Sequence, residues 1–165
     1  MAKGSALAIL ALLIGIGGIA VGGYSLFSIL TEPGVHRTYQ DSRTNPYTPP
    51  SEDSWAVIPG LSITFQVDAG ESVHFLFTCT VYFEPVSGIR WNHFVLKVDG
   101  SRIYESQATV GPTGGTATEY HYSVALQYCN TTMPSGQHVV VVEYQRETNA
   151  NSYADNCWLF VQTYT

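Results

Sequence analysis

The N-terminal segment is the part of the sequence that most restricts how this chain folds. Residues 6–30 contain no charged side chain, and small residues recur there at spacings of four and three. On an α-helix this spacing places the small residues on one face. The residues of this face are Gly4, Ala8, Ala11, Gly15, Gly18, Gly22 and Ser25. At about 1.5 Å rise per residue the run is about 38 Å long, enough to cross the roughly 30 Å hydrocarbon core of a bilayer.

Close helix packing is one explanation of the small-residue face, because glycine and alanine let two backbones approach each other in an apolar medium. A plain membrane anchor and a cleaved secretory signal are the alternatives, although the run is longer than the apolar core of a typical signal peptide. We expect residues 1–30 to form a hydrophobic helix that lies in a membrane or in the core of a filament. There it contacts copies of itself.

A short polar leader precedes the helix. The residues Met1-Ala2-Lys3-Gly4-Ser5 and the apolar run that follows resemble the start of archaeal type IV pilin-like proteins, in which a peptidase cuts after a basic-plus-glycine pair and the helices bundle. The resemblance implies an archaeal filament subunit. The chain departs from many bacterial relatives because Ile9 occupies the fifth position after such a cut, where they carry Glu. Cleavage after Gly4 therefore stays open.

Composition limits the function classes. Only 12% of the residues are charged, the net charge is −6, and the seven Lys and Arg residues are scattered. Nucleic-acid binding is disfavoured because it needs a basic patch. The many Tyr, Phe, Val and Thr residues are typical of a β-rich fold. Without the helix, the 165-residue chain has room for one domain.

A polar segment follows the helix. Glu32-Pro33-Gly34 ends the helical pattern, and residues 45–51 are polar and rich in proline. We expect residues 31–54 to form a linker or stalk. As a flexible chain it has a root-mean-square reach of about 27 Å, which is enough to lift a domain off a surface.

From Trp55 onward apolar and polar residues alternate with a period of two, which predicts antiparallel strands. We expect a two-sheet β-sandwich over residues 55–165 and independent folding of residues 52–165. The predicted strands are Trp55–Ile58, Leu61–Val67, Val73–Phe83, Asn92–Val98, Arg102–Gln107, Tyr120–Cys129, His138–Gln145 and Cys157–Tyr164.

Three segments of this domain, residues 58–65, 94–100 and 134–142, together with the long aromatic strand between them and a final aromatic strand, resemble single jelly-roll domains of the tumour necrosis factor-like type. The resemblance implies a compact antiparallel jelly roll, often trimeric, that is used for binding or assembly. The order of short inner tail, helix, stalk and outer domain also matches the membrane-anchored ligands of that family.

Several side chains are candidates for modification or contact. Asn130-Thr131-Thr132 is an N-glycosylation pattern beside a turn. One disulfide is expected in an extracellular domain, and the sequence leaves all three pairings open. The cysteines are Cys79, Cys129 and Cys157, of which Cys79 is as easily a buried apolar residue. Tyr120, Tyr122 and Tyr128 share one strand face that either fills the core or forms a lateral contact between domains.

Catalysis finds little support in the sequence. The five histidines, His36, His74, His93, His121 and His138, form no spaced ligand cluster, and no nucleophile-elbow or phosphate-loop pattern is present. The carboxylates near turns, Asp68, Glu71, Asp99, Glu105 and Asp155, fit solvated surface groups better than a loop calcium site. We expect no enzyme activity, no metal and no cofactor.

The sequence therefore predicts a non-enzymatic, self-assembling structural protein of the cell surface, either a filament subunit or part of a surface array. Its partners are copies of itself and a membrane. The alternative is a single-pass, membrane-anchored adhesion or ligand-binding module that recognises a protein or a glycan through its jelly roll. Lys3 on one side of the helix and Arg37 and Arg43 on the other decide orientation only weakly. We expect the C-terminal domain to lie outside the cell.

Overall fold

The computed structural model describes residues 34–84, 90–112, 119–147 and 151–165. The expected N-terminal helix, with its seven small residues from Gly4 to Ser25, lies outside these residues. Within the described ranges there is no helix long and apolar enough to span a membrane.

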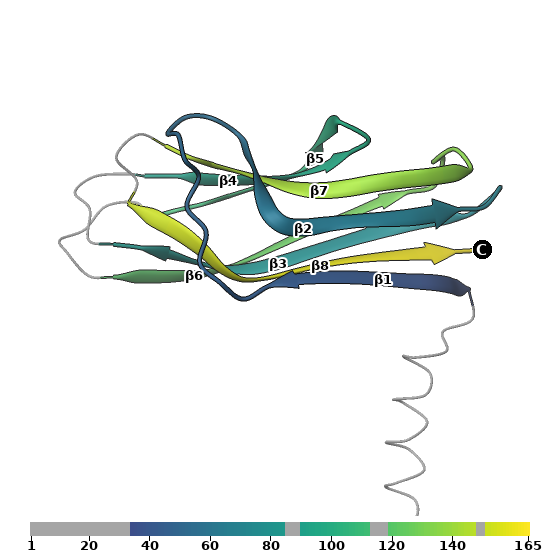
Figure 1. Cartoon of the computed structure of the whole chain (residues 1–165), viewed down its shortest axis with the longest axis horizontal. Helices are drawn as coiled ribbons and strands as arrows, with labels where there is room; N and C mark the ends of the chain where they lie inside the picture. The colour runs from purple at the N-terminus through teal and green to yellow at the C-terminus, as the bar shows by residue number, and fades with distance from the viewer. Residues whose placement is uncertain (1–33, 85–89, 113–118, 148–150) are drawn as a thin grey trace, which may run out of the picture. The chain divides into compact units, whose positions relative to one another are not determined.

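The described part of the chain forms eight strands arranged in two four-stranded sheets that lie face to face (Figure 1). One sheet has the order β1-β8-β3-β6 and the other the order β2-β7-β4-β5. The strands are β1 (Val35–Arg43), β2 (Ala56–Val67), β3 (Ser72–Phe83), β4 (Asn92–Val98), β5 (Ser101–Val110), β6 (Tyr120–Asn130), β7 (Gly136–Arg146) and β8 (Ser152–Tyr164).

Strand neighbours are far apart in sequence, because β3 pairs with β6 and β8, and β7 pairs with β2 and β4, all antiparallel. This arrangement confirms the predicted two-sheet antiparallel sandwich. Eight strands split into two such sheets are compatible with a jelly roll.

The core lies between the sheets and follows from the alternation of side chains along each strand. In β3 every second residue from Val73 to Phe83 is buried, and β7 and β8 contribute matching apolar rows. Aromatic rings join the layers, since Phe77 lies 5.9 Å from Phe94 and Phe94 stacks on Tyr144 at 4.5 Å between ring centroids. Each large side chain buried in this way contributes roughly 1.5–3 kcal/mol to stability.

Strand β1 lies where we expected a linker. Its residues alternate between half-buried and exposed, as in a strand, but the inward row carries charged groups. These groups are satisfied by the neighbouring sheet: Asp41 Oδ2 accepts a hydrogen bond from the backbone N–H of Ser62 at 3.0 Å, and Arg43 donates to the carbonyl of Pro59 at 2.9 Å. Tyr39 packs against Phe65 with 6.2 Å between ring centroids. Inward-pointing charges are a common feature of edge strands. Because they interrupt the alternation of apolar and polar residues, the sequence pattern did not predict this strand.

Two further boundaries differ from the prediction. The two short strands expected over residues 55–67 are one strand, β2, with a register shift between Val57 and Ser62. Strand β8 begins at Ser152, five residues before Cys157. The proline-rich segment is also bound to the sandwich, because Tyr47 exchanges backbone hydrogen bonds of 2.8 and 2.9 Å with Ala154 of β8.

Candidate functional site

The outer face of the β1-β8-β3-β6 sheet carries two groups of aromatic side chains. In the first, Trp158 and Phe160 of β8 lie stacked with ring centroids 6.3 Å apart and an interplanar angle of 10°. Leu76 of β3 is the cross-strand partner of Phe160. Trp158 is 41% exposed, which is high for a tryptophan. We call Trp158, Phe160 and Leu76 the Trp158 cluster.

The second group lies farther along the same strands. Tyr82 of β3 stacks on its β8 partner Tyr153 at 4.8 Å between centroids with an interplanar angle of 11°. The ring of His121, on β6, meets the edge of Tyr82 at 4.3 Å. We call Tyr82, Tyr153 and His121 the Tyr82 cluster.

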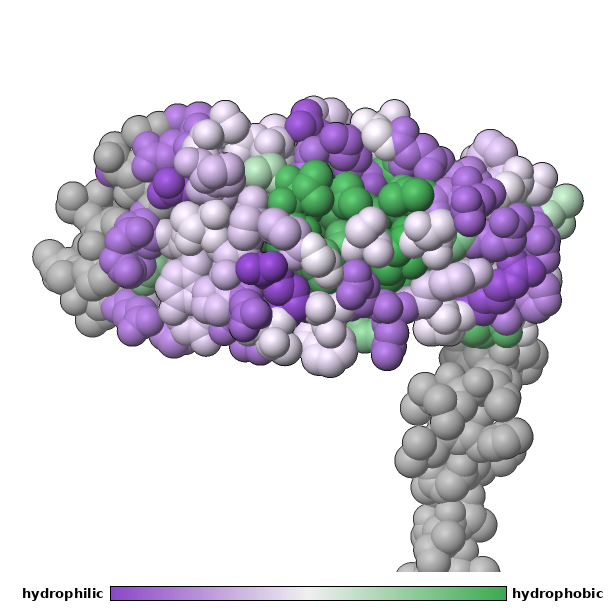
Figure 2. Space-filling view, viewed as in Figure 1, coloured by the Kyte–Doolittle hydropathy of each residue, from purple (hydrophilic) through white to green (hydrophobic). Residues whose placement is uncertain are grey.

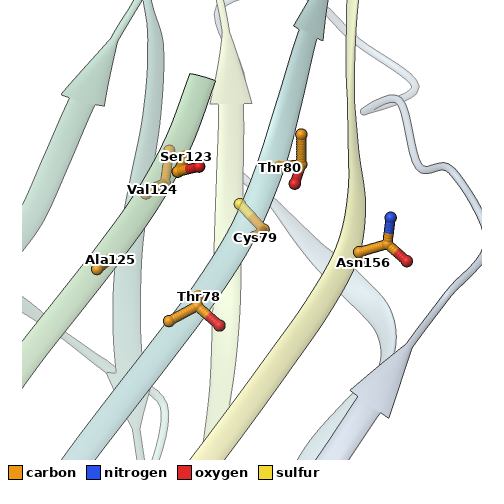
Figure 3. A pocket seen from close by; sticks show the side chains of 7 residues that line it. All are labelled: Thr78, Cys79, Thr80, Ser123, Val124, Ala125 and Asn156. Carbon is orange, nitrogen blue, oxygen red and sulfur yellow. The ribbon is translucent and has the colours of Figure 1, made fainter. Parts of the chain in front are cut away.

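A hollow of about 310 Å³ lies on this face between the rows that carry the two clusters. Figure 3 shows Thr78 and Thr80 on β3, between Ser123 and Ala125 on β6 and Asn156 on β8. The buried residues Cys79 and Val124 complete its lining. We call this site the polar hollow, because hydroxyl and amide groups dominate its outward-facing residues.

A β-bulge in β8 makes room for the hollow. The pairing of β3 with β8 shifts register between Thr78 and Thr80, so that Asn156 is an extra residue on the β8 side. Asn156 has a φ of 48°, in the left-handed region that asparagine tolerates better than most residues. Its backbone N–H donates to Asp155 Oδ1 at 2.8 Å, which holds the bulge in place.

The same bulge brings two cysteines together. Cys79 and Cys157 are both buried and face the core, with their thiols next to each other. The neighbouring thiol of Cys157 and burial raise the pKa of the Cys79 thiol. Cys129 is exposed on the outer face of β6. Of the three pairings that the sequence left open, the structure places only Cys79 and Cys157 side by side; both are present as free thiols.

The outer face of the other sheet has a different character. Val57 of β2 and Val139 of β7 are 40% and 41% exposed, and Val141 is half-buried on the same side of β7. In β2 the uncharged Thr64 and Ser62 are the cross-strand partners of Val139 and Val141. Two charged residues also adjoin these valines, because Val57 is opposite Glu143 and Val141 is opposite Lys97 of β4. Figure 2 shows hydrophobic residues gathered in the middle of the molecule, over β2 and β7. We call Val57, Val139 and Val141 the valine patch.

A buried ion network borders the valine patch. Glu143 of β7 is 3% exposed and accepts hydrogen bonds from Lys97 at 2.8 Å and from Arg102. Burial opposes its charged form, but these two cations outweigh burial and lower the pKa of Glu143. The guanidinium of Arg102 also lies 5.3 Å from the ring centroid of Trp55. The two cations compensate the buried carboxylate, and the three groups together keep one positive charge.

The only cluster of metal-ligand type among the described residues is His36, Asp68 and Glu71, whose ligand atoms lie within 4.8 Å of one another. Arg37 already occupies the cation position: it is hydrogen-bonded to Asp68 and lies 3.8 Å from Glu71 Oε2. Burial opposes ionisation of Glu71, but hydrogen bonds from the backbone of Asp68 and from His36 lower its pKa. The cluster therefore fits a structural ion network at the start of β1.

The remaining candidates from the sequence are three tyrosines and Asn130, and each of them contacts neighbouring residues of the fold. Tyr120, Tyr122 and Tyr128 lie on the inner side of β6, half-buried against the core, and Tyr122 meets Phe83 edge-on at 5.7 Å. This placement favours the core-filling interpretation over a lateral contact. Asn130 ends β6, and its side-chain oxygen accepts hydrogen bonds from the backbone N–H of Thr132 at 2.9 Å and from its hydroxyl at 3.3 Å.

His138 is the histidine closest to a catalytic arrangement, because its Nδ1 lies 2.6 Å from Asp99 Oδ2. Its Nε2, however, lies 2.8 Å from the carbonyl oxygen of Pro134. Both ring nitrogens therefore donate to acceptors and neither can take a proton from a substrate. The hydrogen bond to Asp99 raises the pKa of His138 despite burial.

The sequence pattern did not predict the polar hollow. The strands that became β3 and β6 were predicted over its lining, but the predicted last strand began at Cys157 and left out Asn156. Trp158 and Phe160 alternate correctly for one strand face, but nothing local marks the extra residue at Asn156. An exposed tryptophan two residues from a phenylalanine was the available signal.

No protein-family model and no curated protein sequence matches the chain. Among solved structures, a chain of infectious bursal disease virus strain Gx is similar at 13% identity with a TM-score of 0.43, over 76% of this chain and 32% of that one. A Bacillus endospore appendage, from disulfide-linked pili, is similar at 12% identity and a TM-score of 0.34, over 78% and 89%. The carbohydrate-binding module CBM36, solved with calcium and xylotriose, is similar at 11% identity and a TM-score of 0.34, over 76% and 89%. This chain spans about a third of the virus chain, and none of these likenesses bears on function.

Proposed function

We propose that this chain is a non-enzymatic, self-assembling structural protein of the cell surface that displays its β-sandwich on the outside. The valine patch carries the proposal. Val57 and Val139 are each about 40% exposed, and the carboxylate beside them in the same rows, Glu143, is paired with Lys97 and Arg102. An exposed apolar area bordered by paired charges is typical of a contact between subunits.

The N-terminal segment supports the same proposal. Its small-residue face from Gly4 to Ser25 is suited to helix packing in a membrane or a filament core. The likenesses to type IV pilin-like leaders and to tumour necrosis factor-like jelly rolls, with glycosylation of Asn130 outside the cell, belong to this proposal. Both imply subunits that meet through a helix and through an outer domain.

The test uses the purified full-length protein in detergent and compares Val139→Lys with a matched control. Gln127→Lys adds the same charge at an exposed position on the outer face of the other sheet. We expect the lysine at 139 to reduce the assembly to smaller species in sedimentation velocity, because it places a charge inside an apolar contact. The control keeps the wild-type size. An unchanged size distribution for Val139→Lys, with an unchanged melting temperature, would contradict assembly through the valine patch.

A membrane-anchored ligand-binding module is the second candidate function. The observation that favours it is the polar hollow between the Trp158 and Tyr82 clusters, on the sheet face opposite the valine patch. Concave sites with a few polar groups and aromatic walls are the usual form of a ligand site.

A further inference from the structure

We propose that the polar hollow and the two aromatic clusters beside it bind a neutral oligosaccharide. The proposal deepens the ligand-binding candidate and rests on it. It does not depend on self-assembly, which uses the valine patch on the other sheet.

The lining of the hollow sets the charge and polarity of the ligand. Thr78, Thr80 and Ser123 present hydroxyl groups, and within the described part of the chain these groups have no side-chain hydrogen bond. A hydroxyl can both donate and accept, as can the hydroxyls of a sugar. None of the lining residues is charged, and the carboxylate of Asp155 lies next to Asn156. An anionic ligand would meet this carboxylate with no cation among the lining residues to offset it.

The aromatic clusters determine which part of a sugar they contact. A pyranose ring has an apolar face of C–H groups and a polar edge of hydroxyls, so that aromatic rings cover the face while hydroxyls and amides bind the edge. The rings within each cluster are almost parallel, at 10° for Trp158 and Phe160 and 11° for Tyr82 and Tyr153. Because the rings of a pair are stacked, a sugar can contact only the ring surface that the neighbouring ring leaves uncovered. Trp158, at 41% exposure, is the most exposed of these four rings and is the one best placed to cover the face of a sugar.

The separation of the clusters indicates more than one sugar unit. Trp158 is the cross-strand partner of Thr78, and Tyr153 is the partner of Tyr82, four residues farther along β3. At a rise of about 3.3 Å per residue, the two rows are about 13 Å apart. A ligand that touches both clusters and crosses the hollow is therefore a short chain of sugars.

A second copy of this protein is a poorer occupant of the same face. A dry contact between protein surfaces would bury the hydroxyls of Thr78, Thr80 and Ser123 without assured partners, and each buried unpaired polar group costs about 1–3 kcal/mol. The hollow also divides the apolar surface into two small areas. A sugar chain offers hydroxyls to the polar hollow and apolar C–H faces to the two aromatic clusters.

The experiment measures binding to full-length protein in detergent. The probes are hexasaccharides of xylose, glucose, mannose and N-acetylglucosamine, with polygalacturonate as the anionic probe. Candidates from an immobilised array are then titrated while tryptophan emission is recorded. We expect at least one neutral probe to bind and to change the emission. Trp158→Ala should weaken that binding about tenfold or more. Thr80→Val, which keeps the shape and removes one hydroxyl, should weaken it severalfold.

Tyr104→Ala is the matched control, because Tyr104 is 59% exposed on β5 of the other sheet. It should keep the wild-type affinity. The proposal is overturned if no neutral probe binds at millimolar concentration, if only the anionic probe binds, or if Trp158→Ala and Thr80→Val both retain full affinity. Assembly is read separately by Val139→Lys, so a loss of sugar binding with unchanged oligomer size concerns the polar hollow alone.

Discussion

A single buried imidazole, that of His138, ties two turns of the sandwich together. His138 donates from Nδ1 to Asp99 in the β4–β5 turn and from Nε2 to the carbonyl of Pro134 in the β6–β7 turn. Asp99 also accepts a hydrogen bond from the backbone N–H of Val139 at 2.9 Å. Because both ring nitrogens face acceptors, the charged imidazolium is the form that satisfies both contacts.

This arrangement predicts how stability changes with pH. The pKa of His138 is raised above its ordinary value of 6.5 by Asp99, so its contribution is full below pH 6.5 and is lost as pH rises through the folded-state pKa. The pKa of Asp99 is lowered from 3.8, because the hydrogen bonds from His138 and Val139 outweigh burial. The stability that Asp99 contributes is therefore present above pH 3.8 and is lost as pH falls through its folded-state pKa.

Urea unfolding of the wild type between about pH 6 and pH 9 should show a falling free energy of unfolding. A tenfold difference in proton affinity between the folded and unfolded states corresponds to about 1.4 kcal/mol. His138→Gln should flatten this fall, and His74→Gln, on the outer face, should keep it. Parallel pH profiles for wild type and His138→Gln would show that the ion pair does not stabilise the fold.

At the scale of the strand, β1 forms the edge of its sheet beside β8 and carries charged side chains there. It covers the edge of β8 and brings Tyr39 against Phe65. At its start His36 and Arg37 contact the buried carboxylate of Glu71. The chain therefore enters the sandwich through an ion network and not through a free stalk.

This predicts that the domain needs its first strand. A fragment of residues 34–165 should unfold at higher urea concentration than a fragment of residues 52–165. The difference should be about 2–4 kcal/mol, since the shorter fragment loses a half-buried aromatic ring, ladder hydrogen bonds and the partners of Glu71. Within the longer fragment, Tyr39→Ala should lose part of this stability. Thr38→Ala, which faces outward, is the control. Equal stability of the two fragments would show that β1 is dispensable.

At the scale of the whole molecule, the two outer sheet faces have different chemistry. The β2-β7-β4-β5 face has the valine patch and the ion network of Glu143, whereas the β1-β8-β3-β6 face has the polar hollow and its two aromatic clusters. In the function proposed above, one face contacts neighbouring copies and the other holds a ligand.

The N-terminal segment should contribute to assembly independently of either face. Gly15→Leu together with Gly18→Leu should keep membrane insertion, because the segment becomes more apolar, and should prevent close helix contact. We expect detergent cross-linking to give fewer oligomers than the wild type. Leu10→Ile, a change of the same segment away from the small-residue face, is the control. Wild-type cross-linking by the double variant would leave the segment as a plain anchor.

The β-sandwich could be predicted from the sequence, because the evidence for it is local. The alternation along Val73–Phe83 and the Asp99-Gly100 turn each act within a few residues, and these elements lie as predicted. The apolar run over residues 139–142 lies in the strand predicted there, but among the described residues the cover on both faces that a continuous apolar run indicates is absent, because Val139 is 41% exposed. Strand β1 escaped because its inward side chains include Arg37, Asp41 and Arg43, whose partners are distant in sequence.

The candidate site, in contrast, depends on contacts between strands that are distant in sequence. The polar hollow combines residues of β3, β6 and β8 that are up to 78 positions apart and depends on the extra residue Asn156 in the register of β8. The proximity of Cys79 and Cys157, the inward placement of Tyr122 and the hydrogen bond between His138 and Asp99 likewise depend on which strands are neighbours. The physical reason is that the period of a strand fixes which side chains share a face. The register between neighbouring strands is set by packing over the whole sandwich, and it determines which side chains of these strands lie next to each other.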